Sequence, residues 1–126
     1  MDFELTDEQK MVVDSVDKLL SDQYDFQSRC KRLSSNVRFD LSVWQHFASM
    51  GLLGMPLPTE YGGFSASVSD LSALMEPMGA SLVIEPFLYC TLGSWLLSQT
   101  ASKAIQKRYF PSIVSGETRV VVAMRP

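Results

Sequence analysis

The sequence is poor in the residues that most often build metal centres and acid–base sites. It contains one histidine, His46, and two cysteines, Cys30 and Cys90, among 126 residues. The cysteines stand far apart and carry no metal-ligand spacing, so they indicate two reduced thiols rather than a metal site. His46 has no positioned partner in the sequence, and we expect a half-exposed helix residue rather than a catalytic base.

Runs of basic residues and long apolar stretches are also absent. The formal net charge is −3, and no stripe of Lys or Arg offers a surface to a phosphate backbone, which argues against nucleic acid as a partner. No apolar stretch approaches the ~20 residues that a bilayer-spanning helix needs. Asp2 and Glu4 stand where a signal peptide would carry basic residues. We therefore expect a cytoplasmic protein without a membrane span.

The composition is that of one folded domain, because 46% of the residues are hydrophobic and 20% are charged. Near the N-terminus, Thr6 and Gln9 form a capping box ahead of an apolar series at helical spacing. This pattern predicts a first helix from about residue 7 into the low twenties or beyond. The polar, partly basic stretch 30–36 predicts a connection. The buried stripe of the first helix is predicted to be Val12, Val16, Leu19 and Leu20.

A short second helix is predicted next, with Asp40 as its cap and Gly51 as its left-handed stop. Its buried face holds Trp44, Phe47 and Ala48.

An ordered apolar loop follows over residues 51–65, because Pro56 and Pro58 forbid a continuous helix there. The pair Gly62-Gly63 lacks the preceding strand and the third glycine of a phosphate-binding fingerprint, so it predicts a tight turn.

Three further helices are predicted in the second half of the chain. The third begins at the capping pair Ser67 and Asp70 and ends or bends at Pro77 and Gly79. Pro86 suits the first position of the fourth helix, and Thr100 is the expected cap of the fifth. Pro111 and the pair Ser115-Gly116 close the fifth. The predicted buried stripes are Leu88, Leu92, Trp95 and Leu96 in the fourth helix and Ile105, Tyr109 and Phe110 in the fifth.

The last segment changes character, because residues 118–124 are rich in β-branched side chains and have no helical period. They predict a buried strand that has no partner in this chain, so we expect the parent protein to continue, or this strand to pair with another chain. The sequence thus predicts an all-α bundle of about five to six helices that ends in an unpaired strand.

These features, in this order, resemble the acyl-CoA dehydrogenase family over essentially the whole chain. The family's opening resembles Phe3–Gln9, and its best-known N-terminal stretch resembles Trp44 followed by the long string Met50–Gly63. Further matches fall in family order: Asp70, Met75–Gly79, Lys107–Pro111 and Ser115–Glu117.

The resemblance implies a three-part enzyme, of which this chain holds the N-terminal helical domain (1–117) and the first strand of the middle β-domain (118–126). The family dehydrogenates acyl-CoA thioesters at the α,β-bond with FAD and passes the electrons to electron-transfer flavoprotein, and its members form oligomers. Its catalytic glutamate belongs to a C-terminal bundle that this chain lacks, so the chain has no catalytic residue. The glutamates expected to be caps, solvated charges or loop contacts are Glu60, Glu76, Glu85 and Glu117.

The resemblance also assigns candidate site residues. The fourth helix of the family lines the acyl pocket, which points to Ile84, Leu88, Leu92 and Trp95, although helix-spaced residues of this kind are also typical of a core. Gly93 within this helix indicates close packing or the approach of a ligand. The loop 51–65 is a wedge against neighbouring domains in the family, so its apolar side chains should be exposed in this chain: Leu57, Tyr61 and Phe64.

The end of the chain departs from the family, which usually continues into Thr-Glu-Pro at the flavin. Met124-Arg125-Pro126 stand there instead, so a hydroxyl donor is missing and backbone N–H groups at Ala123 and Met124 remain as the candidate flavin contacts. Pro77 is a second departure. Both changes fit a divergent flavoprotein, and both also fit a non-catalytic helical subunit or interaction module that pairs with a flavin-bearing partner.

Overall fold

A computed structural model describes residues 4–37 and 39–125, and in them it shows six α-helices, two 3₁₀ helices and no strand. The all-α prediction is confirmed. Every helix in the described part falls short of the length and hydrophobicity that a membrane span requires. Asp2, Phe3 and Pro126, on which parts of the sequence interpretation rest, lie outside the described residues, as do the outer ends of the predicted ranges 1–117 and 118–126.

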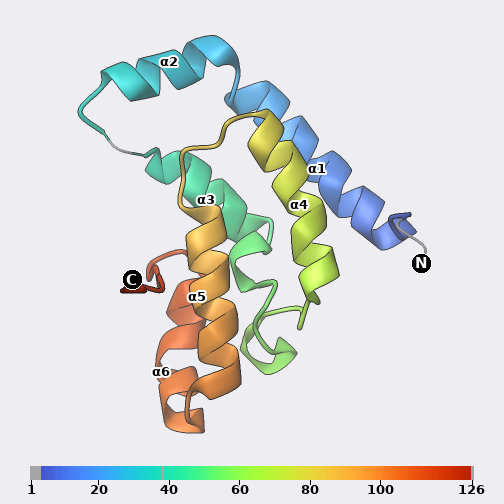
Figure 1. Cartoon of the computed structure of the whole chain (residues 1–126), viewed down its shortest axis with the longest axis vertical. Coiled ribbons are helices and arrows are strands. Elements are labelled where there is room, and N and C mark those ends of the chain that lie inside the picture. The colour runs from blue at the N-terminus through green and yellow to red at the C-terminus, as the bar shows by residue number, and fades with distance from the viewer. Residues whose placement is uncertain (1–3, 38, 126) are drawn as a thin grey trace. The chain divides into compact units, whose positions relative to one another are not determined.

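The chain divides into two compact units, and each is described here by itself. The first unit comprises Met1–Asp40 with Val68–Ile84, and the second comprises Leu41–Ser67 with Glu85–Pro126. Figure 1 traces the helices of both along the chain.

In the first unit, α1 (Asp7–Gln23) packs along α4 (Val68–Ala80), as Figure 1 shows. The predicted capping box is present, because the Thr6 hydroxyl accepts the Gln9 N–H at 3.2 Å and the Gln9 side-chain oxygen accepts the Thr6 N–H at 2.9 Å. The Gln9 side-chain amide also donates to Asp70 Oδ1 at 2.7 Å and so links the two helices. The contact between the two helices includes four buried apolar residues: Val16, Leu20, Leu71 and Leu74.

The predicted connection over residues 30–36 is wrong, because most of that stretch belongs to α2 (Phe26–Ser34). This helix buries no residue, so no apolar stripe marks it in the sequence. Its cap is Asp25, whose carboxylate accepts the Ser28 N–H at 2.7 Å, and this hydrogen bond holds the pKa of Asp25 below its usual value. Arg32 ties α2 back to α1, with its Nη2 donating to the Gln23 carbonyl at 2.9 Å.

The second unit contains α3 (Leu41–Ser49), α5 (Phe87–Thr100) and α6 (Lys103–Val114), with two 3₁₀ turns in the intervening loop, η1 (Leu52–Gly54) and η2 (Thr59–Tyr61). Its core includes an aromatic chain, in which the Phe47 ring lies edge-on to Trp44 at 6.4 Å and to Phe87 at 5.7 Å between centroids. Gly51 has φ 77°, the left-handed stop that the sequence predicts after α3.

The loop 51–65 packs more tightly than predicted. Leu57 was expected to be exposed, but its side chain is 0% exposed and packs with Phe110 and Ile113. Tyr61 covers this cluster edge-on at 5.2 Å from the Phe110 ring, whereas Phe64 is 61% exposed as expected. Gly63 is required at the predicted tight turn, because a Cβ there would lie 2.1 Å from the Leu57 carbonyl oxygen.

Helix ends in the second half differ from the predictions by one or two residues. Thr100 is the last residue of α5, and the cap of α6 is Ser102, whose hydroxyl accepts the Ile105 N–H. Pro86 stands at the N-cap position of α5, one residue before the first position of the helix. The predicted buried face of α6 is right for Phe110 and wrong for Ile105 and Tyr109, which are exposed; the buried residues are Gln106, Phe110 and Ile113.

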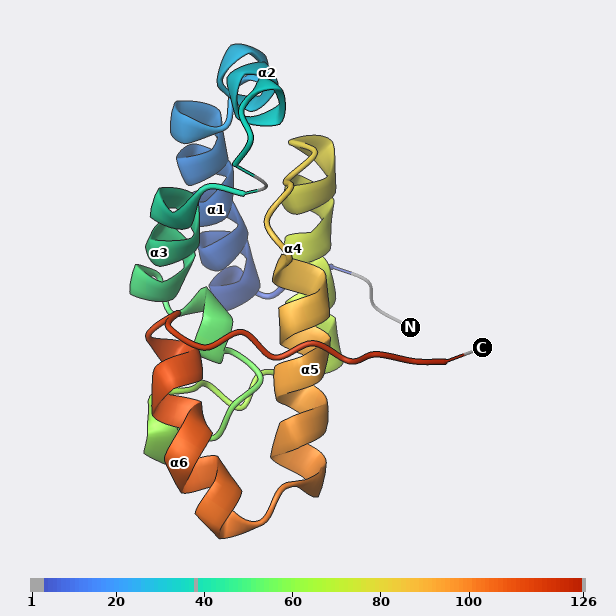
Figure 2. The same ribbon diagram turned by 90° about the vertical axis from the view of Figure 1, so that its left-hand side faces the viewer.

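Residues 118–125 form no strand in this chain and run as an extended tail across α5, as Figure 2 shows. A strand needs the backbone of a partner, so pairing of this segment and the boundary at residue 118 stay predictions.

Candidate functional site

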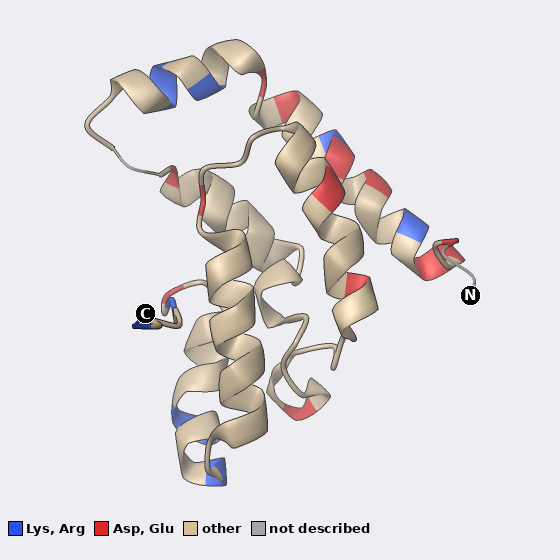
Figure 3. Cartoon of the chain, in the orientation of Figure 1, with Lys and Arg blue, Asp and Glu red and all other residues tan. Residues whose placement is uncertain are grey.

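Helix α5 carries three of the four candidate pocket residues, and it bears no charged side chain (Figure 3). Apolar residues lie around its whole circumference rather than along one stripe. Such a helix is normally covered on all sides. The described residues cover one side of it and leave a broad apolar surface open.

The open side was predicted to be buried, and that prediction is wrong. Four residues at helical spacing form this surface, here termed the α5 apolar face, and they are exposed as follows: Leu88 46%, Leu92 49%, Trp95 39% and Leu96 41%. Tyr89, which the sequence did not single out, is more exposed still. Three of the four candidate pocket residues therefore lie together on one accessible surface.

The fourth candidate, Ile84, lies in the first unit and does not belong to the α5 apolar face. Its side chain is half-buried, and its backbone N–H donates to the Tyr24 hydroxyl at 2.7 Å. This hydrogen bond holds the segment that follows α4 against Tyr24, so the backbone of Ile84 stabilises the first unit.

The covered side of α5 faces the aromatic core and the tail. It presents Phe87, Cys90, Thr91, Gly93 and Ser94. Small side chains dominate this side, so other parts of the backbone can approach the helix closely. Sequence periodicity favoured the larger Leu and Trp residues as the core and so selected the wrong side.

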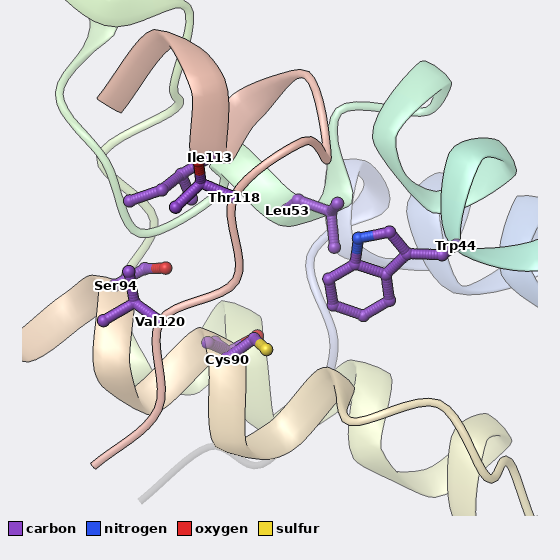
Figure 4. Close-up of a pocket in the computed structure, with 8 residues that line it drawn as sticks. Trp44, Leu53, Cys90, Ser94, Ile113, Thr118 and Val120 are labelled. Carbon is purple, nitrogen blue, oxygen red and sulfur yellow. The ribbon is translucent and has the colours of Figure 1, made fainter. Parts of the chain in front are cut away.

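A small cavity of about 10 Å³ lies between α5, α6 and the tail, room for about one water molecule. Figure 4 shows Val120 of the tail beside Cys90 and Ser94 of α5. The cavity is too small for an acyl chain, so it is a packing feature. Its lining comprises Trp44, Leu53, Cys90, Thr91, Ser94, Ile113, Thr118 and Val120.

Cys90 is the only titratable group of this covered side among the described residues, and burial raises the pKa of its thiol. The charge of Arg119 and a hydrogen bond from the Val120 backbone act in the opposite direction. A buried thiol whose pKa is raised is a poor nucleophile, so Cys90 has the character of a structural residue.

The tail ends in the two candidate flavin contacts. Met124 is 87% exposed, and none of the described backbone hydrogen bonds involves residues 121–125. The N–H groups of Ala123 and Met124 are therefore available as donors, and no side-chain hydroxyl accompanies them in residues 121–125.

Within the part of the chain that the structure describes, the other ionisable side chains assemble no catalytic set. Glu60 is exposed and paired with Lys103 at 3.0 Å, and Glu85 is buried at the start of α5. His46 Nδ1 lies 2.9 Å from the Ser42 carbonyl oxygen of its own helix. The described residues contain no group of three or more ligand-type side chains that could hold a metal ion.

Comparison with known proteins identifies the family and the fold of this chain. Residues 6–117 match the family described as acyl-CoA dehydrogenase, N-terminal domain. The acyl-CoA dehydrogenase FadE12 of Mycobacterium tuberculosis is 30% identical over 88 residues, which cover 65% of this chain and 22% of the relative. Cyclohex-1-ene-1-carbonyl-CoA dehydrogenase of Syntrophus aciditrophicus is 26% identical over 110 residues, which cover 86% of this chain and 26% of the relative.

Two solved structures share the fold. A chain of the ChsE4-ChsE5 complex from Mycobacterium tuberculosis superposes with a TM-score of 0.87 at 24% identity, over 98% of this chain and 34% of that one. A variant of the steroid ACAD Tcur3481-Tcur3483 superposes with a TM-score of 0.81 at 23% identity, over 89% of this chain and 31% of that one. This chain spans about a quarter of the length of the curated relatives named above. It belongs to the acyl-CoA dehydrogenase family and corresponds to the family's N-terminal helical domain.

Proposed function

We propose that this chain serves as the N-terminal domain of an FAD-dependent acyl-CoA dehydrogenase and that the α5 apolar face forms one wall of its acyl pocket. The supporting observation is the accessibility of Leu88, Leu92 and Trp95 on a helix without a charged residue. An exposed surface of this kind is stabilised when another apolar group covers it.

Such a wall binds by removing apolar surface from water. Each methylene that a fatty or alicyclic acyl group buries contributes about 0.8 kcal/mol, without orienting the reactive carbons. The wall therefore sets affinity and chain-length preference, and the catalytic step depends on groups outside this chain.

FAD, when bound, supplies the oxidant for the α,β-dehydrogenation of the CoA thioester. This chain offers the backbone N–H groups of Ala123 and Met124 as hydrogen-bond donors, and its α5 apolar face carries no carboxylate that could remove the α-proton. The enzyme would pass its electrons to electron-transfer flavoprotein, as the family resemblance implies.

The test uses the purified protein in which this chain occurs. Anaerobic addition of straight-chain, alicyclic and steroid side-chain acyl-CoA thioesters should bleach the flavin absorbance for at least one of them. Leu88→Trp should narrow the pocket and shift the preference towards shorter acyl groups. Ile105→Trp is a matched control, because Ile105 is similarly exposed at 41% but lies on α6. An equal shift in both variants would contradict the assignment of the wall.

A second candidate is a helical subunit without catalysis of its own, which shapes the pocket of a flavin-bearing partner chain. It is supported by Met124 and Arg125 in place of the usual hydroxyl-bearing sequence, and by the fold shared with the two-protein ChsE4-ChsE5 complex. A purified protein that is colourless alone and gains bound flavin only when co-expressed with a partner chain would favour this candidate.

A further inference from the structure

Three contacts fix the beginning of the tail on the second unit. The Trp44 indole N–H donates to the Gly116 carbonyl at 3.1 Å, and the Thr118 N–H donates to the Ser112 carbonyl at 3.0 Å. The third contact is the approach of Val120 to Gly93 on α5. Val120 is partly buried, whereas Val121 and Met124 beyond it are exposed. The contact at Val120 is therefore the last firm one before the candidate flavin contacts.

The approach at Gly93 is possible only without a side chain. A Cβ at this position would lie 2.4 Å from the Val120 carbonyl oxygen and 2.8 Å from its carbonyl carbon, closer than real Cβ atoms come. The atoms that a Cβ at position 93 would overlap belong to the backbone of Val120, so a change of side-chain rotamer cannot relieve the clash. Glycine inside a helix costs about 1 kcal/mol relative to alanine, so α5 carries this residue at a penalty to its own stability.

We propose that Gly93 is a positioning residue, which seats the tail directly on α5 and so sets the place from which residues 121–124 leave the domain. This inference rests on the proposed function for its consequence. One side of α5 would hold the acyl group and another would hold the segment that meets the flavin, so a single rigid helix would fix the distance between them.

Substitution of Gly93 has a definite geometric effect. Restoring ordinary contact beyond 3.4 Å from a starting distance of 2.4 Å requires Val120 to move by about 1 Å. The helix itself tolerates alanine, and the tail is extended, so the tail is the part that moves. Cys90 lies under it and accepts the Val120 N–H, which makes the Cys90 thiol a reporter of tail docking.

The experiment measures the rate at which a thiol reagent labels Cys90 in the 126-residue chain, with exposed Cys30 changed to serine in every variant. Gly93→Ala should label roughly tenfold faster than the parent, the factor that corresponds to about 1.4 kcal/mol in the docking equilibrium. Gly79→Ala is the matched control, because a Cβ at this helical glycine meets nothing within 4 Å. Equal rates in the two alanine variants overturn the proposal.

A double-mutant cycle separates tail docking from a general effect on the helix. Val120→Gly loosens the tail from its own side, so it should also speed labelling, and adding Gly93→Ala should then change little. If Gly93→Ala unfolds the chain and Val120→Gly does not restore it, Gly93 is a core residue and the proposal fails.

The flavoprotein in which the chain occurs supplies the second readout. Gly93→Ala should shift its flavin absorbance maximum and Gly79→Ala should not. Faster Cys90 labelling with an unchanged flavin spectrum supports the role of Gly93 in seating the tail and instead counts against the proposed flavin contacts at Ala123 and Met124.

Discussion

Replacing Leu57 with alanine should destabilise the second unit far more than replacing Leu88 does. Leu57 is 0% exposed and packs with Phe110 and Ile113, so its truncation leaves a cavity and should cost about 2–5 kcal/mol. Leu88 is 46% exposed, and a surface substitution of this kind changes stability by about 0.5 kcal/mol or less. The expected difference between the two variants is therefore at least about 1.5 kcal/mol.

Urea unfolding followed by tryptophan fluorescence measures this difference directly. The two tryptophans of the chain, Trp44 and Trp95, both lie in the second unit, so the signal reports on the part of the protein that holds Leu57 and Leu88. Equal losses in the Leu57→Ala and Leu88→Ala variants would mean that Leu88 is covered in solution. The α5 apolar face would then be core, and the assignment of an acyl wall to it would fail.

Three further predictions concern the backbone at two glycines, the thiol of Cys90 and the helix cap at Asp25. Gly63→Ala should destabilise the chain by several kcal/mol, because its Cβ would overlap the Leu57 carbonyl oxygen. Gly79→Ala should stabilise the chain by up to about 1 kcal/mol, because a Cβ at this helical position meets no other atom. Thermal unfolding of the two variants measures both effects. Burial raises the pKa of the Cys90 thiol, so as pH rises this thiol ionises in the unfolded chain before it does in the folded chain. The free energy of unfolding should therefore fall above about pH 8.5. Urea titrations at several pH values measure this fall, which should be smaller in Cys90→Ala. The pKa of Asp25 is lowered in the folded chain, so its stabilising cap is fully present above the unfolded pKa and is lost as pH falls through the folded pKa. The protection of the backbone amides of residues 26–34 against hydrogen exchange should decrease in that pH range, and Asp25→Ala should show the same decrease at neutral pH.

Several local features could be predicted because they depend on neighbouring residues alone. The capping box at Thr6 and Gln9 and the left-handed Gly51 follow from side-chain chemistry and glycine geometry within one turn. Helix α2 escaped prediction because a helix that buries nothing leaves no apolar period. The cap of α6 is Ser102 rather than the predicted Thr100, because both residues can cap a helix and the packed structure selects between them.

The sequence by itself determined that this chain is an all-helical domain of the acyl-CoA dehydrogenase family, since caps, glycines and the residue strings of the family are local properties. Tertiary structure decided which side of α5 is covered and which remains open. A helix that is apolar all round has no preferred side until its neighbours are in place, and here small residues rather than large ones meet the core. The burial of Leu57 and the contact between Gly93 and Val120 likewise join residues that are distant in the chain, and no local pattern records such a meeting.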